Sequence, residues 1–237
     1  MNMVVTMDDI KVLAYHFYLP WEGGATYTDH PQDPGGPTKY GVALNYNRDA
    51  IPDKNGDGRI DAEDVRRLTE ADARAIWAKS YWAVGRCDAF PPALAFMMAD
   101  MTVNPGPGAA PKCLQRGINR AADGAFSVAV DGKVGPATLA AIGRLDQVRL
   151  LWEVAAQRAW YYGTRSTFNT FGEGWSRRTT ACLYEALRLA GAAAGRAWAG
   201  PCRCRPWRPP CCSAGSGCSR KSMRPCWSRS LPPAAPP

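Results

Sequence analysis

Residues 21–41 read WEGGATYTDHPQDPGGPTKYG, and this stretch decides how the chain is interpreted. Glu22 ends an apolar segment, and a glycine-rich turn with further carboxylates and a hydroxyl group follows it. Cleavage of a glycosidic bond needs one protonated carboxyl group for the leaving oxygen and a second group on the other face of the sugar. The segment therefore favours a hydrolytic site of this kind.

The positive charge of the chain is concentrated near its C-terminal end. The formal net charge is +8, and residues 197–237 carry seven Arg and Lys side chains and no acidic one. Residues 1–196 are therefore at +1, and a nearly neutral body gives no reason to expect nucleic acid as a partner. With 237 residues the chain can form one or two domains with a proper core.

Cysteine use and the N-terminal residues bear on where the chain is made. Cys87, Cys113 and Cys182 are scattered over the body, which does not make a disulfide framework and suggests a reducing compartment. Residues 1–9 have no basic region before an apolar stretch, so no signal peptide is expected. No segment is apolar for long enough to be read as a transmembrane helix.

Apolar residues recur with the helical period over most of the chain, and strand signals are weak, so the chain is expected to be mainly α. A first helix over 8–20 should end or kink at Pro20, close to Glu22. Residues 42–52 are left unassigned. Further helices are expected at 64–82, 91–103, 109–120, 137–144, 145–163 and 176–195.

Residues 197–237 differ from the rest of the chain. They are rich in Pro, Arg, Cys, Ser and Trp and show no period, which predicts a disordered basic tail. Two explanations stay open. The reading frame has slipped in a GC-rich gene, or the tail is genuine and touches anionic cell-wall polymer or lipid.

The motif around Glu22 resembles the signature of glycoside hydrolase family 108, whose members are lysozyme-like muramidases of phages and bacteria, some labelled secretion activators. The similar residues run from Glu22 to Val42 and continue through Tyr81-Trp82. They include the Asp100–Gly108 segment, Leu114-Gln115-Arg116 and the Asp131-Gly132-Lys133-Val134-Gly135-Pro136-Ala137-Thr138-Leu139 run, which resembles the peptidoglycan-binding half usual in this family.

This resemblance implies a lysozyme-like fold with three parts: a catalytic lobe over 8–108, a peptidoglycan-binding-like helical lobe over 109–195, and the tail. It implies hydrolysis of the β-1,4 bond between N-acetylmuramic acid and N-acetylglucosamine, as in a phage endolysin. With no signal peptide, the enzyme would be made in the cytoplasm. It would then reach the periplasm or cell wall through a holin or a secretion system.

Glu22 is the expected general acid, since Trp21 and the helix end would desolvate its carboxyl group and raise its pKa. The second group is left open. Asp33 or Asp29 would balance the developing positive charge, or the site has no second carboxylate, because Asp in such a turn often caps the loop. Thr38 holds the attacking water or contacts the sugar, or is a turn hydroxyl.

Three more residues are candidates for substrate binding. Tyr27 and Tyr40 would stack on sugar faces, unless they are core residues beside the glycine turn. Asn104 precedes a Pro-Gly-Pro-Gly break and would line the cleft. Asp131, Gly132 and Pro136 also fit a tight turn into a capped helix, which is a structural role.

Residues 53–64 match an EF-hand-type calcium loop. The loop predicts a structural Ca²⁺ that would stabilise an insertion beside the cleft. No cofactor is expected to take part in the chemistry. It departs from the pattern in carrying Asp rather than Glu at its twelfth position and Pro52 before its first, and the alternative is a solvated acidic loop. The expected ligands are Asp53, Asn55, Asp57, the carbonyl of Arg59, Asp61 and Asp64.

Two rival functions remain, and the first is a cell-wall amidase or peptidase. A zinc amidase typically uses two His ligands, and the chain has only His16 and His30 without a supporting motif. A cysteine peptidase needs an activated thiol, and Cys87 lies in no such context. The other rival is a non-catalytic peptidoglycan-binding or secretion-associated wall protein, which shares the expected fold.

Overall fold

The computed structural model describes residues 5–30 and 33–193, so the predicted disordered tail lies outside the described residues. The described part is mainly helical, which confirms the predicted fold class. No helix in it is long and apolar enough to cross a membrane. In chain order the elements are α1 (Met7–Tyr18), η1 (Leu19–Glu22), β1 (Thr38–Lys39), β2 (Val42–Ala43), α2 (Leu44–Asn47), α3 (Ala62–Arg67), α4 (Glu70–Trp77), η2 (Ala78–Ala83), η3 (Cys87–Ala89), α5 (Pro92–Val103), α6 (Ala110–Ala122), α7 (Pro136–Ile142), α8 (Gln147–Gly163) and α9 (Phe168–Ala193).

The first helix carries the chain to Glu22. The hydroxyl group of Thr6 accepts a hydrogen bond from the backbone N–H of Asp9, and the Asp9 carboxylate bonds back to Thr6, which fixes the start of α1. The α-helix ends at Tyr18, and η1 continues as a 3₁₀ turn with Pro20 near its start. The predicted break at Pro20 is confirmed, and it places Glu22 at the end of the turn.

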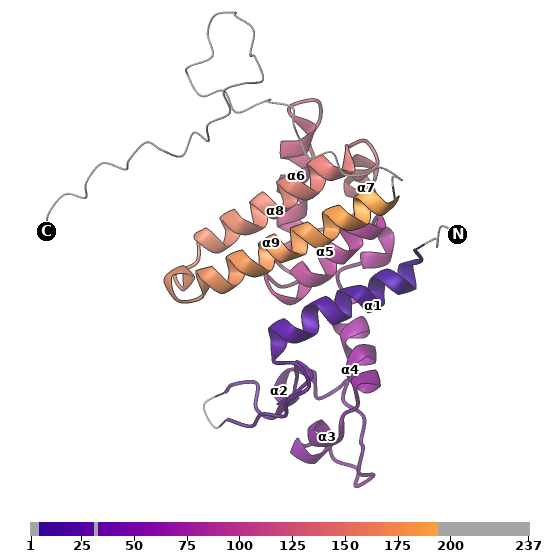
Figure 1. Cartoon of the computed structure of the whole chain (residues 1–237), viewed down its shortest axis with the longest axis vertical. Helices are drawn as coiled ribbons and strands as arrows, with labels where there is room; N and C mark the ends of the chain where they lie inside the picture. The colour runs from indigo at the N-terminus through magenta and orange to yellow at the C-terminus, as the bar shows by residue number, and fades with distance from the viewer. Residues whose placement is uncertain (1–4, 31–32, 194–237) are drawn as a thin grey trace, which may run out of the picture. The chain divides into compact units, whose positions relative to one another are not determined.

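A bundle of long helices forms the main core. Helix α5 is buried along almost its whole length, and α1 and α9 both pack against it. Helix α8 packs between α6 and α9, and in Figure 1 α8 and α9 run side by side. One hydrophobic cluster extends from Ile10 to Ala190, so both lobes expected from the sequence share it.

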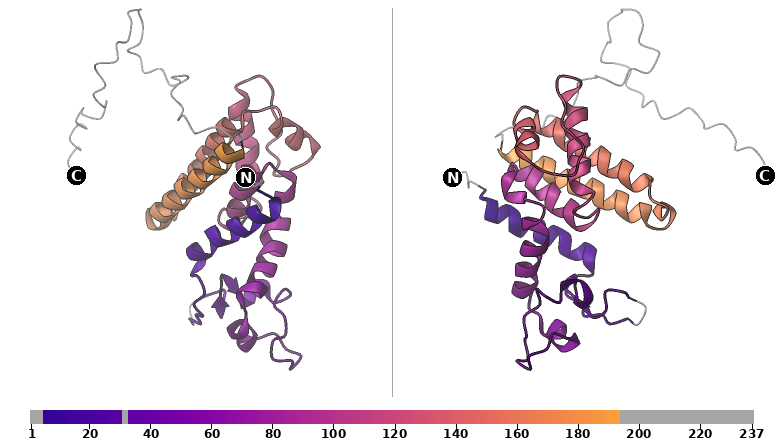
Figure 2. Two further views of the ribbon diagram at one scale, coloured as in Figure 1. Left: turned by 45° about the vertical axis from the view of Figure 1, so that its right-hand side comes forward. Right: turned by 180° about the vertical axis from the view of Figure 1, so that it is seen from behind.

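The chain between η1 and the end of α4 forms a second, smaller core. The two-residue strands β1 and β2 pair antiparallel, with Thr38 opposite Ala43. The side chains buried there come from β2, from α2, α3 and the residues that follow them, and from α4: Val42, Leu44, Ile51, Val65, Leu68, Ala73 and Ile76. Figures 1 and 2 show this part of the chain on the far side of α1 from α6 and α8.

Two of the expected helices differ from the structure. The helix predicted over 64–82 is broken, because the hydroxyl group of Thr69 caps a new helix by accepting from the N–H of Asp72. The last helix begins at Phe168 rather than near 176. Gly172 hides this start in the sequence, since glycine is a poor helix former. A Cβ atom at Gly172 would lie 2.8 Å from the ring of Phe168. The Phe168 ring can therefore pack against the helix only because residue 172 has no side chain.

Candidate active site

Glu22 lies where η1 meets the glycine-rich turn. Its side chain is 32% exposed, so the carboxyl group is within reach of a ligand. Gly41 approaches it from the hairpin. A Cβ atom at Gly41 would lie 3.0 Å from the Cβ of Glu22 and 2.1 Å from the hydroxyl oxygen of Tyr18, and its φ is +72°. Only glycine fits both the backbone conformation and the space.

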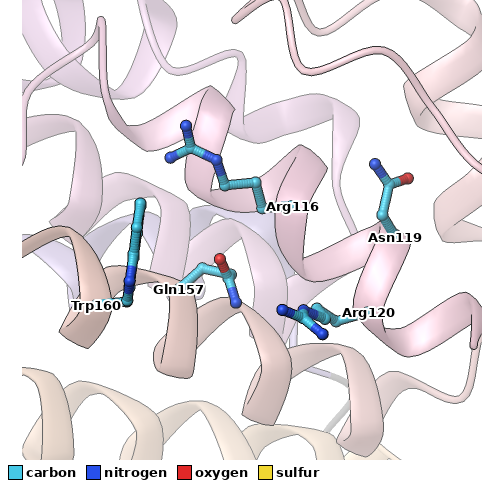
Figure 3. A pocket seen from close by; sticks show the side chains of 5 residues that line it. All are labelled: Arg116, Asn119, Arg120, Gln157 and Trp160. Atoms are coloured by element: carbon cyan, nitrogen blue, oxygen red, sulfur yellow. The ribbon is translucent and has the colours of Figure 1, made fainter.

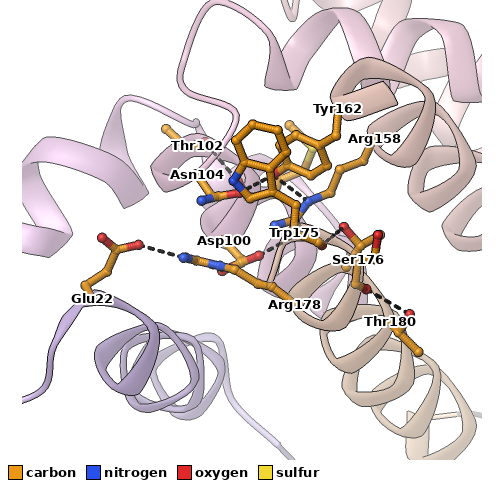
Figure 4. A network of polar contacts seen from close by, with 12 residues as sticks. Glu22, Asp100, Thr102, Asn104, Arg158, Tyr162, Trp175, Ser176, Arg178 and Thr180 are labelled. Carbon is orange, nitrogen blue, oxygen red and sulfur yellow. Dashed lines mark hydrogen bonds and ion pairs between the residues drawn. The ribbon is translucent and has the colours of Figure 1, made fainter. Parts of the chain in front are cut away.

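The Glu22 carboxylate is held by an arginine from the last helix (Figure 4). The Nη1 of Arg178 donates to the Oε1 of Glu22 over 2.6 Å, and the Arg178 side chain is only 4% exposed. The sequence predicts that Trp21 and the helix end desolvate this acid. The group that bonds it is a guanidinium 156 residues away, and a charge-assisted hydrogen bond of this kind fixes the carboxylate in place.

Arg178 is itself held by Asp100 in the middle of the bundle. The Nε of Arg178 donates to one oxygen of Asp100 over 2.8 Å, and Nη1 of Arg158 donates to the other over 2.6 Å. The side chains of Asp100 and Arg158 are each 1% exposed. Burial acts to raise the pKa of Asp100, but the two guanidinium groups lower it below its usual range. Two acids and two cations therefore form one charge-balanced network, of which only Glu22 is partly exposed.

An aromatic pair extends this network to Asn104. The Nε of Arg158 donates to the hydroxyl oxygen of Tyr162 over 3.2 Å, and that hydroxyl donates to the Oδ1 of Asn104. The ring of Tyr162 stacks on Trp175, with centroids 4.8 Å apart (Figure 4). Burial raises the pKa of Tyr162 to about 12, so this phenol stays neutral. Asn104, a predicted substrate contact, thus lies beside the network that holds Glu22.

Two tyrosines lie within electrostatic range of Glu22. Burial raises the pKa of Tyr18 and of Tyr81, and the negative charge of Glu22 raises both further. Both phenols therefore stay protonated at neutral pH. Of the two, only Tyr81 belongs to the sequence motifs noted above.

The predicted partners of Glu22 lie in the turn and accept local hydrogen bonds. The Oδ1 of Asp33 accepts from the N–H of Gly35 over 2.8 Å, and the Oδ2 of Asp29 accepts from the hydroxyl of Tyr27 over 3.3 Å. The hydroxyl of Thr38 donates to the carbonyl of Gly36 over 2.9 Å. These contacts shape the turn, and they leave the choice between Asp33 and Asp29 a prediction.

The two tyrosines of the turn pack against the smaller core. Tyr27 and Tyr40 both contact that cluster. The guanidinium of Arg66 lies 4.2 Å from the ring centroid of Tyr27, and the amine of Lys39 lies 5.3 Å from that of Tyr40. One part of each ring is therefore engaged in packing, and sugar stacking by the remaining surface stays a prediction.

Comparison with known proteins supplies the family. Residues 15–106 match the family described as Glycosyl hydrolase 108, and residues 109–180 match the family described as Predicted Peptidoglycan domain. The solved structure of Brucella abortus SagA is 30% identical with a TM-score of 0.61, and the match covers 77% of this chain and 97% of SagA. The chain belongs to the glycosyl hydrolase 108 family. No curated protein matches it.

Membership in the glycosyl hydrolase 108 family gives the class of activity. The chain is a glycoside hydrolase of lysozyme-like type, and its partner is peptidoglycan. Glu22, Asp100 and Asn104 all fall inside the matched catalytic segment. Arg158 and Arg178, which complete the network, fall inside the segment that matches the peptidoglycan domain. Both matched segments thus contribute side chains to the surroundings of Glu22.

The Asp131-Gly132 motif of this family-108 chain forms a braced turn. Gln115 of α6 donates to the Oδ1 of Asp131 over 2.7 Å and to the carbonyl of Lys133 over 3.1 Å, and it accepts from the N–H of Gly132 over 2.8 Å. Gln115 is 1% exposed. These contacts agree with the structural role that the sequence allowed for this motif.

In the calcium-type loop of this family-108 chain, the side-chain carboxylates accept hydrogen bonds from backbone N–H groups of the loop itself. The carboxylate of Asp53 accepts from the N–H groups of Gly56 and Gly58 over 2.6 and 2.9 Å. Buried Asp64 accepts from the N–H groups of Lys54 and Asp61, and the bond from Asp61 is the main cause that lowers its pKa. The other expected ligands also make local bonds: Asn55 and Asp57 with each other, Arg59 N–H to Asp57, and Asp61 to the N–H of Glu63.

The carboxylates of this loop do not converge. Within residues 5–30 and 33–193, no three His, Cys, Asp or Glu side chains gather closely enough to hold a metal ion. Asp53 and Asp57 accept backbone N–H bonds, and their carboxylates keep further lone pairs that a cation can share. The calcium site therefore stays a prediction.

Proposed function

We propose that this chain is an N-acetylmuramidase that cleaves the β-1,4 bond between N-acetylmuramic acid and N-acetylglucosamine, with Glu22 as the proton donor. The observation that carries the proposal is the position of Glu22. Its carboxyl group is partly exposed, yet it is tied through Arg178 to the fully buried Asp100. Such a tether holds a reacting group in one geometry on a rigid frame.

The geometry of the tether leaves one oxygen for the chemistry. Arg178 bonds Oε1 of Glu22, while none of the described residues makes a hydrogen bond to Oε2. In this proposal the leaving oxygen receives its proton from Oε2 once a sugar covers the site and excludes water. Asp33 is proposed to balance the positive charge on the other face of the sugar, with Asp29 as the alternate.

The proposal is tested on purified peptidoglycan. The wild-type chain should release new reducing ends that mass spectrometry identifies as N-acetylmuramic acid. Glu22→Gln should lower the rate by a factor on the order of 10²–10⁴. Glu173→Gln is a matched control, because Glu173 is an exposed acid of α9 whose ion pair within the described part of the chain is with surface Arg177.

Other products would contradict the proposal in distinct ways. Reducing ends of N-acetylglucosamine would place the cleavage at the other glycosidic bond. If neither the wild type nor Glu22→Gln releases sugar while both bind the wall, the chain is a non-catalytic wall-binding protein. Release through a holin or a secretion system stays a prediction.

A further inference from the structure

Two neighbouring open pockets lie along α6 and α8, and the second also borders residues 105–109. One has a volume of about 560 Å³ and the other about 800 Å³, and Arg116 and Trp160 line both. The two pockets therefore form one continuous depression, here called the α6–α8 groove. Figure 3 shows its first part, with the side chains of Arg116 and Arg120 on α6 and those of Gln157 and Trp160 on α8.

Helices α6 and α8, which supply most of the groove's charged and aromatic side chains, approach very closely at Gly117. A Cβ atom at Gly117 would lie 2.6 Å from the Cγ2 of Val154, so a larger residue would push α6 and α8 apart. The braced turn at Asp131 fixes α6 from the other side through Gln115. The groove is therefore lined by side chains that project from a rigid helix pair.

Positive charge dominates the groove. Lys112, Arg116, Arg120 and Arg165 line it, and none of the described lining residues is acidic. Within the described part of the chain these four cations make no ion pair, whereas the neighbouring Arg149 does, with Asp123. Cations gathered in a depression without acidic partners attract an anionic ligand.

Aromatic rings lie among these cations. Trp160 is 56% exposed, and the guanidinium of Arg116 lies 5.2 Å from the centroid of its ring. The guanidinium of Arg165 lies 4.6 Å from the ring of Tyr161. Stacking on a ring orients a guanidinium and leaves its N–H fork available for a carboxylate. An exposed ring beside a carboxylate-binding fork suits a ligand that combines a sugar face with an acidic group.

We propose that the α6–α8 groove binds the peptide stems of peptidoglycan, with Arg116 and Arg120 on the stem carboxylates and Trp160 on the adjoining sugar. This inference rests on the proposed action on peptidoglycan. It names the part of the substrate that binds at a distance from Glu22. The open groove suits a polymer that passes along it. The free carboxylates of peptidoglycan are on the stems, because the lactyl carboxyl group of muramic acid is consumed in the amide bond to the stem.

The experiment measures binding in the Glu22→Gln background, where the glycan is not consumed. Full-length protein is mixed with intact sacculi and with stripped sacculi, whose stems have been removed by an amidase and whose lactyl carboxyl groups, freed by that cleavage, have been converted to methyl amides. The added pair Arg116→Gln and Arg120→Gln should weaken binding to intact sacculi about tenfold and leave binding to stripped glycan unchanged. Arg149→Gln, on the same helix as Trp160 and with the same loss of charge, should change neither.

Several results would overturn the inference. One is equal binding of intact and stripped sacculi by the parent. Another is unchanged binding of intact sacculi by the Arg116 and Arg120 variant when circular dichroism shows it to be folded. A third is a similar loss of affinity of this variant for phosphatidylglycerol vesicles or duplex DNA, which would assign the groove to anions in general.

Different results would contradict the proposed function and this inference. With Glu22 restored, the Arg116 and Arg120 variant should hydrolyse stripped glycan at the wild-type rate. Loss of that rate would place these arginines in catalysis and overturn the assignment to stems. If the wild type cleaves no glycan, the proposed function fails, while the binding comparison between intact and stripped sacculi still decides the role of the groove.

Discussion

The carboxylate of Glu22 lies 2.6 Å from the guanidinium of Arg178, and Arg178 reaches on to the buried carboxylate of Asp100. The acid at the turn is therefore anchored to the middle of the helix bundle by one side chain. Because Asp100 also pairs with Arg158, two helices besides α5 must be in place before Glu22 is held. This arrangement makes the proposed proton donor dependent on the whole fold.

Removal of Arg178 should harm both stability and activity. Arg178→Ala leaves Glu22 without its anchor and Asp100 with one cation in place of two, so the free energy of unfolding should fall by about 3–5 kcal/mol. Arg177→Ala is the matched control, since Arg177 pairs with Glu173 on the surface and its loss should change stability by less than about 0.5 kcal/mol. Urea unfolding followed by circular dichroism measures both. Equal losses in the two variants would contradict the role given to Arg178.

Gly41 should not tolerate a side chain. Gly41→Ala forces a Cβ atom against Tyr18 and Glu22 at a positive φ, so it should lower both the melting temperature and the rate of glycan cleavage per folded molecule. Gly124→Ala has a φ of +83° and open space around it, so it should cost about 1 kcal/mol of strain and leave the rate unchanged. A Gly41→Ala enzyme of normal rate would show that the hairpin does not position Glu22.

Substitution of Asp33 by asparagine distinguishes the role of its negative charge from its role in forming the turn. Asp33→Asn keeps the oxygen that accepts from Gly35 but removes the negative charge, so stability should be preserved while kcat falls by about a hundredfold or more. Asp29→Asn should stay active. Loss of activity only in Asp29→Asn would move the role to that residue, and full activity in both would leave the site without a second carboxylate. Initial rates of reducing-sugar release decide among the three.

Calcium should stabilise the loop at residues 53–64. If the loop binds Ca²⁺, saturating CaCl₂ should raise the melting temperature relative to EDTA, and a concentration one hundred times the Kd would contribute about 2.7 kcal/mol. Asp53→Asn should abolish the shift, since the first position of the loop pattern requires Asp and the change removes its charge without emptying the space. Calorimetry of Ca²⁺ binding provides an independent readout. An identical shift in Asp53→Asn, or no heat of binding to the wild type, would refute the site.

Some features follow from local sequence and were predictable. The helix over 92–103 is recognisable because nearly every residue in it is apolar, and the end of the first helix is marked by Pro20. Thr69 shows the limit of such reasoning. Its cap divides a helix whose apolar period continues across the break, so periodicity alone favours one long helix.

Other features had no local signal. Arg158 and Arg178 look like ordinary polar positions of amphipathic helices, and nothing in their neighbourhood marks them as buried partners of Asp100. Trp175 and Tyr162 are also separate aromatic residues until α8 and α9 pack together. The unusual residue that could have raised the question is Asp100, an acid within an apolar helix that must be paired if it is buried.

The sequence by itself determined the mainly helical class, the turn that presents Glu22 and the family that this turn resembles. Capping, helical period and glycine turns act over a few residues, so they can be read from the chain. Only the tertiary structure decided that Arg178 holds Glu22 across 156 positions, that Arg158 meets Asp100 across 58, and that Arg116 lies over Trp160. These pairs exist because packed helices bring together residues that no local rule connects.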